Sequence, residues 1–412
     1  MYRCLIRYGQ IAGRLTAWFG LTAFWALWIG VFVHYMAPRL GYFVPGALIG
    51  NDQPCGRPEC DFTDFWRAGL SVRFSPGALR GLVPPLRPGT LFPLPGGYHE
   101  GFPYPPPALL PADLVSHLPF EAGFLAWTLV WAVLAVCLWR WAGLSWLVIM
   151  ASLLSPAALW NTMLGQLGVI GGAILVAGLL KGAARPTSAG AWLGLLACKP
   201  QTGILVPAAL LGQRSWRGIY GFAGMVALLV AMTMLLFGPS VWLGYFGHGQ
   251  AGAATLLDAG FAPRTAQASG VSVFWALRSL HAGTGLAGVG QMGVSALVMA
   301  FVMWLWAQAR LDRHDKVALT VLLSLLATPY GYTDDMVAGS VMLAVLAERR
   351  GWRIGLADVA FWLWPALCPT VSLLSGVLFT PLVVALAAWR VWRAAALRRA
   401  VAVLPATPTG AR

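Results

Sequence analysis

The stretch from Trp141 to Leu180, WAGLSWLVIMASLLSPAALWNTMLGQLGVIGGAILVAGLL, contains 40 residues and no Asp, Glu, Lys or Arg. As a helix it would be about 60 Å long, because each residue adds about 1.5 Å. A bilayer core is about 30 Å thick, so this length suits two crossings. Its most polar part, Asn161-Thr-Met-Leu-Gly-Gln166, lies near the middle. The stretch therefore predicts two membrane-spanning helices that turn at Asn161 to Gln166.

The whole composition agrees with this stretch. Hydrophobic residues make up 58% of the chain and charged residues 10%, with a mean hydropathy of +0.71. Soluble domains carry about 25% charged residues, so too little polar surface is available here to cover a soluble core. The 21 tryptophans suit the headgroup zone of a bilayer. These features predict an all-α polytopic membrane protein.

The net charge of +14 is distributed in short basic clusters between long uncharged runs. Cytoplasmic loops of membrane proteins are rich in Lys and Arg. We therefore attribute the excess of positive charge to the orientation of the protein in the membrane and predict no nucleic-acid partner. The protein is expected in the cell (inner) membrane, with both termini in the cytoplasm. The clusters are the N-terminus, Arg140, Lys181 with Arg185, Arg214 with Arg217, Arg310 to Lys316, Arg349 to Arg353, and Arg390 to Arg399.

Each segment between two clusters should leave the cytoplasm and return. The first runs through a retained helix at 17–36, an outer loop at 37–121 and a returning helix at 122–139. A later one rises at 219–237 and returns at 289–307, with a second outer loop at 238–288. The last, 354–389, should turn around Pro365 to Pro369. The sequence thus predicts one membrane domain, 1–389, with ten to twelve helical segments and a basic cytoplasmic tail, 390–412.

Two segments are too short for two crossings. Residues 186–213 would form only about 42 Å of helix, and 317–347 little more. We predict a re-entrant pair of half-helices at 186–213, which requires a protein or aqueous lining around the break. The alternative is a single span, which would place one flanking Arg cluster outside. The tips of the two segments carry Lys199-Pro-Gln201 and Thr328-Pro-Tyr-Gly-Tyr-Thr-Asp-Asp335.

Charges inside these segments are informative because they are costly in a membrane, about 2.5–3.5 kcal/mol each near the centre. Within the two short segments the acidic and basic groups at the tips are Lys199, Asp334 and Asp335, all on the predicted outer side. They form a candidate substrate site together with Gln166 and Gln201. Ordinary polar turns at hairpin ends are the structural alternative.

The first outer loop is rich in candidates. Asp61 and Asp64 are three residues apart and would share one helix face. A partly desolvated carboxylate can act as a general base, although Asp before an apolar run is also a common helix cap. Further on, prolines hold Tyr104 in a rigid segment that could line a substrate site or cover the helices.

The same loop contains Cys55 and Cys60, which could form a small disulfide in an oxidising compartment. No further Cys or His stands at metal-ligand spacing, so no metal site is predicted. The sequence contains no HExxH, Walker loop or GxSxG motif, which gives no support to zinc-protease, NTPase or serine-hydrolase chemistry.

In their order along the chain, these motifs resemble glycosyltransferase family 87, polytopic bacterial enzymes with the C-type glycosyltransferase fold. The resemblance extends over about residues 60 to 350. The motifs are Thr63-Asp64-Phe, Phe102-Pro-Tyr104-Pro-Pro, Leu118-Pro119, Gly165-Gln166, Lys199-Pro-Gln201, Arg214-Ser-Trp-Arg217, Thr328-Pro329 and Tyr332-Thr-Asp-Asp335.

The resemblance implies inverting transfer of a hexose, usually mannose, from a polyprenyl-phosphate carrier to a lipid or glycan acceptor outside the cytoplasm. By motif position Asp64 is the general base, with Asp61 as the fallback. Positive charge at the leaving phosphate would come from Lys199, with Arg264 or Arg278 from the second outer loop. Tyr104, Gln166, Gln201 and either Asp334 or Asp335 would bind the substrates, and no cofactor is implied.

Two other functions remain open from the sequence. A lipid-linked glycan ligase or polymerase would also act outside the cytoplasm, but an outer loop rich in Arg and His would favour it. A lipid-linked sugar transporter or flippase would also have broken helices, although transporters often show two similar halves with midplane sites.

The segment 267–272, Gln-Ala-Ser-Gly-Val-Ser, matches the family only loosely, which leaves the sugar and the acceptor undetermined.

Overall fold

The computed structural model describes residues 60–74, 102–246, 257–258, 260–263, 265–308 and 310–403. Within these ranges the chain is helical, and the pairing of Gly270 with Tyr332 is an isolated bridge. The predicted first helix and the rest of the first outer loop, with Cys55, lie outside the described residues. The longer helices are α2 (Cys60–Phe74), α4 (Phe120–Ala142), α7 (Gly168–Lys181), α10 (Trp216–Phe237), α14 (Thr284–Ala307), α15 (Arg313–Ala327), α16 (Val337–Arg349), α17 (Leu356–Ser375) and α18 (Thr380–Val403).

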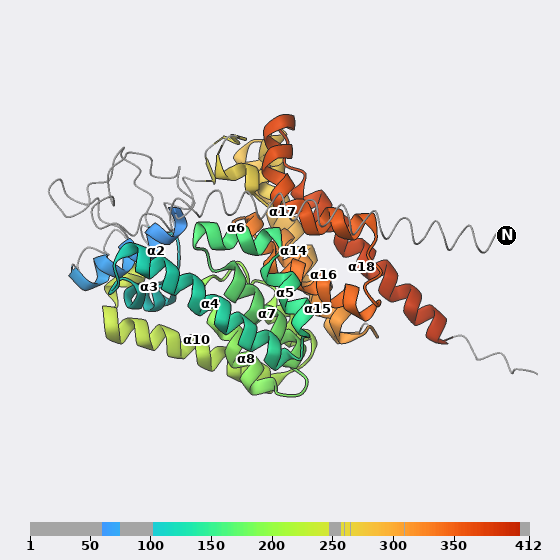
Figure 1. Ribbon diagram of the computed structural model, residues 1–412, viewed down its shortest axis with the longest axis horizontal. Helices are drawn as coiled ribbons and strands as arrows, with labels where there is room; N and C mark the ends of the chain where they lie inside the picture. The colour runs from blue at the N-terminus through green and yellow to red at the C-terminus, as the bar shows by residue number, and fades with distance from the viewer. Residues whose placement is uncertain are drawn as a thin grey trace, which may run out of the picture.

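Shorter elements connect these helices. They are η2 (Pro106–Ala108), α3 (Leu109–Val115), α5 (Trp146–Leu153), α6 (Pro156–Leu164), α8 (Pro186–Gly194), η3 (Leu195–Cys198), α9 (Val206–Gly212), α11 (Ser240–Gly244), η5 (Ala266–Ser269), α13 (Val273–Ser279) and η6 (Thr333–Met336). In Figure 1, α2 and α3 lie together at one end of the long axis, and α18 extends towards the other end.

Several helices are long and apolar enough to cross a membrane. In the described part of the chain these are α4, α10, α14, α17 and α18, and a sixth if the bent pair of α5 and α6 is one span. Their outer faces expose large apolar side chains such as Leu235 and Leu297, which water would not solvate well. The predicted class, an all-α polytopic membrane protein, is confirmed.

The uncharged stretch from Trp141 to Leu180 contains three helices, α5, α6 and α7. Ser155 caps α6 by accepting from the backbone N–H of Ala158, and Pro156, which has no N–H, occupies its first turn. This cap and proline separate α5 from α6, and the two helices meet at 54°. The turn predicted at Asn161 to Gln166 is present. The prediction of two full spans was wrong for its second half, because α7 has 14 residues and is only about 21 Å long.

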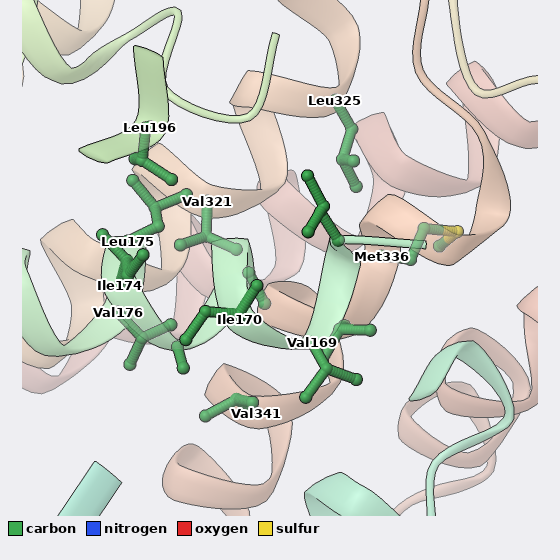
Figure 2. Close-up of a cluster of buried hydrophobic side chains, with 14 of the residues drawn as sticks. Val169, Ile170, Ile174, Leu175, Val176, Leu196, Val321, Leu325, Met336 and Val341 are labelled. Atoms are coloured by element: carbon green, nitrogen blue, oxygen red, sulfur yellow. The ribbon is translucent and has the colours of Figure 1, made fainter. Parts of the chain in front are cut away.

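Helix α7 forms the centre of the core. Figure 2 shows its apolar side chains packed against residues of η3, α15, η6 and α16, namely Val169, Ile170, Ile174, Leu175 and Val176 against Leu196, Val321, Leu325, Met336 and Val341. Glycines let its neighbours approach closely, as at membrane helix interfaces. A Cβ on Gly172, for example, would lie 3.0 Å from the backbone nitrogen of Ala338.

The segment 186–213 is broken as predicted. Helices α8 and α9 have nine and seven residues, and η3 with the turn after Lys199 joins them. Each is too short to span a bilayer core. The segment 317–347 is likewise divided by η6.

The C-terminal hairpin differs from the prediction. Pro365 and Pro369 lie inside α17, and the chain turns at Gly376, whose φ of 71° caps the helix in the left-handed conformation. Prolines are tolerated within membrane helices because neighbouring groups satisfy the freed carbonyls. Helix α18 continues through residue 390, so the predicted tail is helical to Val403. Within this part of the helix, Arg398 binds the Asp315 carboxylate.

Candidate functional site

Six polar side chains from five separate parts of the chain meet at the N-terminal end of α7. Gln166 lies between α6 and α7, Lys199 follows η3, and Asp334 and Asp335 belong to η6. Asp61 comes from the first turn of α2, and Tyr104 precedes η2. We call these six residues the polar cluster. Four of them are close to fully buried, namely Tyr104, Lys199, Asp334 and Asp335.

A buried ion-pair triad forms one half of the cluster. The Lys199 ammonium lies 3.2 Å from an Asp334 oxygen and 2.5 Å from an Asp335 oxygen. The second oxygen of Asp335 accepts from the Tyr332 backbone N–H at 3.2 Å, which orients that carboxylate. A buried charge requires such partners, because removal from water costs several kcal/mol per ion.

Gln166 connects the triad to the first outer loop. Its Oε1 accepts from Lys199 at 3.2 Å, and its Nε2 donates to Asp61 Oδ2 at 2.8 Å. The Tyr104 hydroxyl lies 2.7 Å from Nε2 and 3.0 Å from Oε1, so it can accept from the amide or donate to it. Since one end of the amide faces a cation and the other an anion, the neighbours fix its orientation.

Glycines and Asn161 build the backbone under the cluster. Gly165 ends α6 with a φ of 69°, which places Gln166 beyond the helix end. Asn161 Oδ1 accepts from the Val169 backbone N–H at 3.1 Å and so caps the first turn of α7. A Cβ on Gly168 would lie 2.2 Å from the carbonyl oxygen of Asp334, so only glycine lets η6 approach.

Aromatic rings hold α2 against the rest of the protein. Phe62 and Phe65 are completely buried, and the Phe65 ring centroid lies 4.6 Å from that of Tyr104 and 4.9 Å from that of Trp127. Trp127 also donates to the Gly165 carbonyl at 2.8 Å. Burial raises the pKa of the Tyr104 hydroxyl well above its usual range, which keeps it protonated.

The charge balance of the triad limits what it can bind. One ammonium and two carboxylates have a formal charge of −1, and Asp61 adds another carboxylate nearby. Its carboxylates offer several acceptors to hydroxyl donors, and an anion could bind Lys199 only by replacing one of them. The arrangement therefore suits a polyhydroxylated ligand.

The remaining sequence candidates have different positions. Asp64 lies one turn beyond Asp61 in α2 and is half-buried, and Gln201 is half-buried in the turn after Lys199. Arg278 of α13 donates to backbone carbonyls of Ala282 and Asp258 in its own loop. Arg264, Cys55 and the Cys60 side chain lie outside the described residues.

The second outer loop, predicted at 238–288, includes α11, η5, α13 and the first turn of α14. It reaches the cluster through its backbone, because the Val271 N–H donates to the Gly331 carbonyl at 3.0 Å, next to η6. Sequence reasoning did not single out Asn161, Gly168 or this contact. The only signal was the polar turn at Asn161 to Gln166.

Among the residues that the structure describes, no three His, Cys, Asp or Glu side chains are grouped to hold a metal ion. Searches of curated proteins and of solved structures found no match to this chain. The family model of glycosyltransferase family 87 matches residues 102–329. This range contains Tyr104, Gln166 and Lys199, whereas Asp61, Asp64, Asp334 and Asp335 fall outside it. The match is narrower than the predicted 60 to 350.

Proposed function

Because this chain belongs to glycosyltransferase family 87, and is thus a membrane glycosyltransferase, we propose that it moves a hexose, most simply mannose, from a polyprenyl-phosphate carrier to a lipid or glycan acceptor. The observation that carries this proposal is the polar cluster. Buried acceptors for sugar hydroxyls adjoin Asp61 of the predicted outer loop through Gln166, and Asp64 follows one turn later in α2. The reaction takes place on the extracytoplasmic side of a bacterial inner membrane, with inversion at the anomeric carbon.

The general base is Asp64, and Asp61 is the fallback. An inverting transfer needs one carboxylate to take the proton of the acceptor hydroxyl as its oxygen attacks the anomeric carbon. Asp61 is held by the Gln166 amide and so is tied to the cluster. Asp64 stands one turn further along the same half-buried face of α2. In this assignment Asp61 positions Gln166 and Asp64 removes the proton.

Lys199 binds the donor together with its two carboxylates. The leaving group is a lipid phosphate, which needs positive charge rather than a strong acid as the carbon–oxygen bond breaks. In the described state the charge of Lys199 is already balanced by Asp334 and Asp335. We therefore assign sugar hydroxyls to Asp334 and Asp335. To bind the phosphate, the Lys199 ammonium would exchange one of these carboxylates for a phosphate oxygen as sugar hydroxyls take over that carboxylate. Arg264 or Arg278 would add further positive charge.

One experiment tests the reaction and the base together. Purified full-length protein is given radiolabelled polyprenyl-phosphate-mannose and bacterial membrane lipids, and wild type is compared with Asp64→Asn and Asp61→Asn. We expect labelled product from wild type, loss with Asp64→Asn and partial activity with Asp61→Asn. Equal transfer by wild type and Asp64→Asn would refute the base. Label that crosses a vesicle membrane without forming a covalent product would indicate a transporter instead.

A further inference from the structure

A polar cavity that is largely open to the surface lies at the end of α7 opposite the polar cluster, and we call it the basic cavity. It has a volume of about 490 Å³ and is lined by Gly182, Ala183, Pro186, Gln213, Ser215, Trp306, Leu311, Arg313 and Lys316. This size is within the range of about 300–1,000 Å³ that is usual for ligand sites. The length of α7, about 21 Å, separates this basic cavity from the polar cluster.

Two cations share the basic cavity. Arg313 donates from Nε to the Leu179 carbonyl at 2.8 Å and from Nη2 to Gln213 Oε1 at 3.2 Å. Arg313 and Lys316 both face the Trp306 ring, at 5.2 and 5.6 Å from its centroid. These contacts hold the two charges side by side without neutralising either.

The carboxylates of the same segment have other partners. Asp312 pairs with Arg349 and His314, and Asp315 pairs with Arg398. Within the described ranges neither Arg313 nor Lys316 forms an ion pair with a carboxylate. Burial, and then the adjacent Arg313 charge, lowers the pKa of Lys316. The cavity therefore has an uncompensated positive charge that an anion would balance.

The location of the cavity indicates which anion it meets. It lies between the C-terminal end of α14 and the start of α10, two of the helices able to span the membrane. Trp304 and Trp216, on these same helix ends, are exposed, as is usual for tryptophan in the headgroup zone. Basic pockets between membrane helices on the cytoplasmic side bind anionic headgroups.

We propose that the basic cavity binds the phosphate of an anionic phospholipid from the leaflet on the basic side of the protein. The phosphate oxygens lie between the Arg313 guanidinium and the Lys316 ammonium, the Ser215 hydroxyl faces the glycerol portion, and the acyl chains run along α10 and α14. This site is separate from the sugar-transfer site and would retain its lipid whichever sugar the enzyme uses.

The test measures phospholipid retention by native mass spectrometry of the purified full chain in zwitterionic detergent. Phosphatidylglycerol, phosphatidylcholine and inorganic phosphate are titrated separately. Wild type should retain one phosphatidylglycerol more tightly than phosphatidylcholine, and Lys316→Gln should weaken that binding about fivefold, the effect expected of one lysine at a membrane surface. Lys316→Arg should preserve it.

The matched control is Arg310→Gln, which removes the same charge from an exposed position in the same basic cluster. It should leave retention unchanged. An equal loss in Arg310→Gln and Lys316→Gln would refute the site in favour of general surface charge. Inorganic phosphate that binds as tightly as phosphatidylglycerol would refute the lipid assignment.

A second variant keeps the test decisive if Lys316→Gln does not fold. A Cβ on Gly182 would lie 2.8 Å from Arg313 Nη2, so Gly182→Ala should displace the guanidinium without removing any charge. We expect weaker phosphatidylglycerol binding in this variant as well. Unchanged binding would contradict a role for Arg313.

Discussion

Helix α7 has a buried or half-buried lysine near each end, and the two ends balance charge in opposite ways. At its start, Lys199 lies against Asp334 and Asp335, and the triad is formally negative. At its far end, Lys316 stands beside Arg313, and the nearby carboxylates pair with other groups. A fully paired group is organised before any ligand arrives, whereas an unbalanced one gains most when a counter-ion binds. The comparison separates the proposed donor site, where the cation is already paired, from the proposed phospholipid site, where it is not.

The largest expected effect is on catalysis at the paired end. Asp64→Asn removes the proposed base but keeps the shape of the side chain, so sugar transfer should fall by about 10²- to 10⁴-fold. Labelled-product formation measures this loss. Asp61→Asn is the matched variant on the same helix, and a greater loss there than in Asp64→Asn would exchange the two roles.

Removing the buried ammonium should be the largest change in stability. Lys199→Met leaves two buried carboxylates without their cation, which costs about 3–5 kcal/mol for a broken buried pair. Thermal unfolding in detergent should show a clear decrease in Tm. Lys316→Met, at the other end of α7, removes no ion pair and should change stability by no more than about 0.5 kcal/mol. Similar losses in both variants would remove the distinction between the two ends.

A glycine substitution at each end sharpens the same comparison. Gly168→Ala forces a Cβ against the Asp334 carbonyl, which is backbone and cannot move alone, so about 1–3 kcal/mol of stability should be lost. In Gly182→Ala the tightest contact is the flexible end of Arg313 at 2.8 Å, and the nearest backbone atom, the Gly178 carbonyl oxygen, is 3.3 Å away, so the loss of stability should be smaller than in Gly168→Ala in unfolding experiments without lipid. Equal Tm values for Gly168→Ala and wild type would show that η6 does not pack this closely.

The smallest expected effect concerns the tyrosine hydroxyl. Tyr104→Phe keeps the ring packed on Phe65 and removes a hydrogen bond to Gln166, which should cost about 1 kcal/mol. In transfer kinetics we expect a change of about fivefold, mainly in the KM for the sugar donor. A change of KM below twofold would show that Tyr104 contributes to packing and not to donor binding.

The sequence by itself determined that the protein lies in a lipid membrane and where most of its helices are. Hydrophobic content and basic clusters required a membrane protein, and uncharged runs located α4, α10 and α14 within a few residues. It also marked Gln166, Lys199, Asp334 and Asp335, because polar groups are rare and costly in such runs. These inferences succeed because hydrophobicity and charge cost are properties of a local segment.

Only the tertiary structure decided how these groups meet. The amide of Gln166 joins Asp61 to Lys199 across more than a hundred residues of chain, and Gly168 allows the Asp334 backbone to approach. Pro365 and Pro369 continue a helix where the sequence predicted a turn, because packing and neighbouring groups can offset a local preference. The uncompensated charge of the basic cavity likewise depends on which carboxylates are paired with other cations. Partner choice is a property of the whole fold, so no local pattern could reveal it.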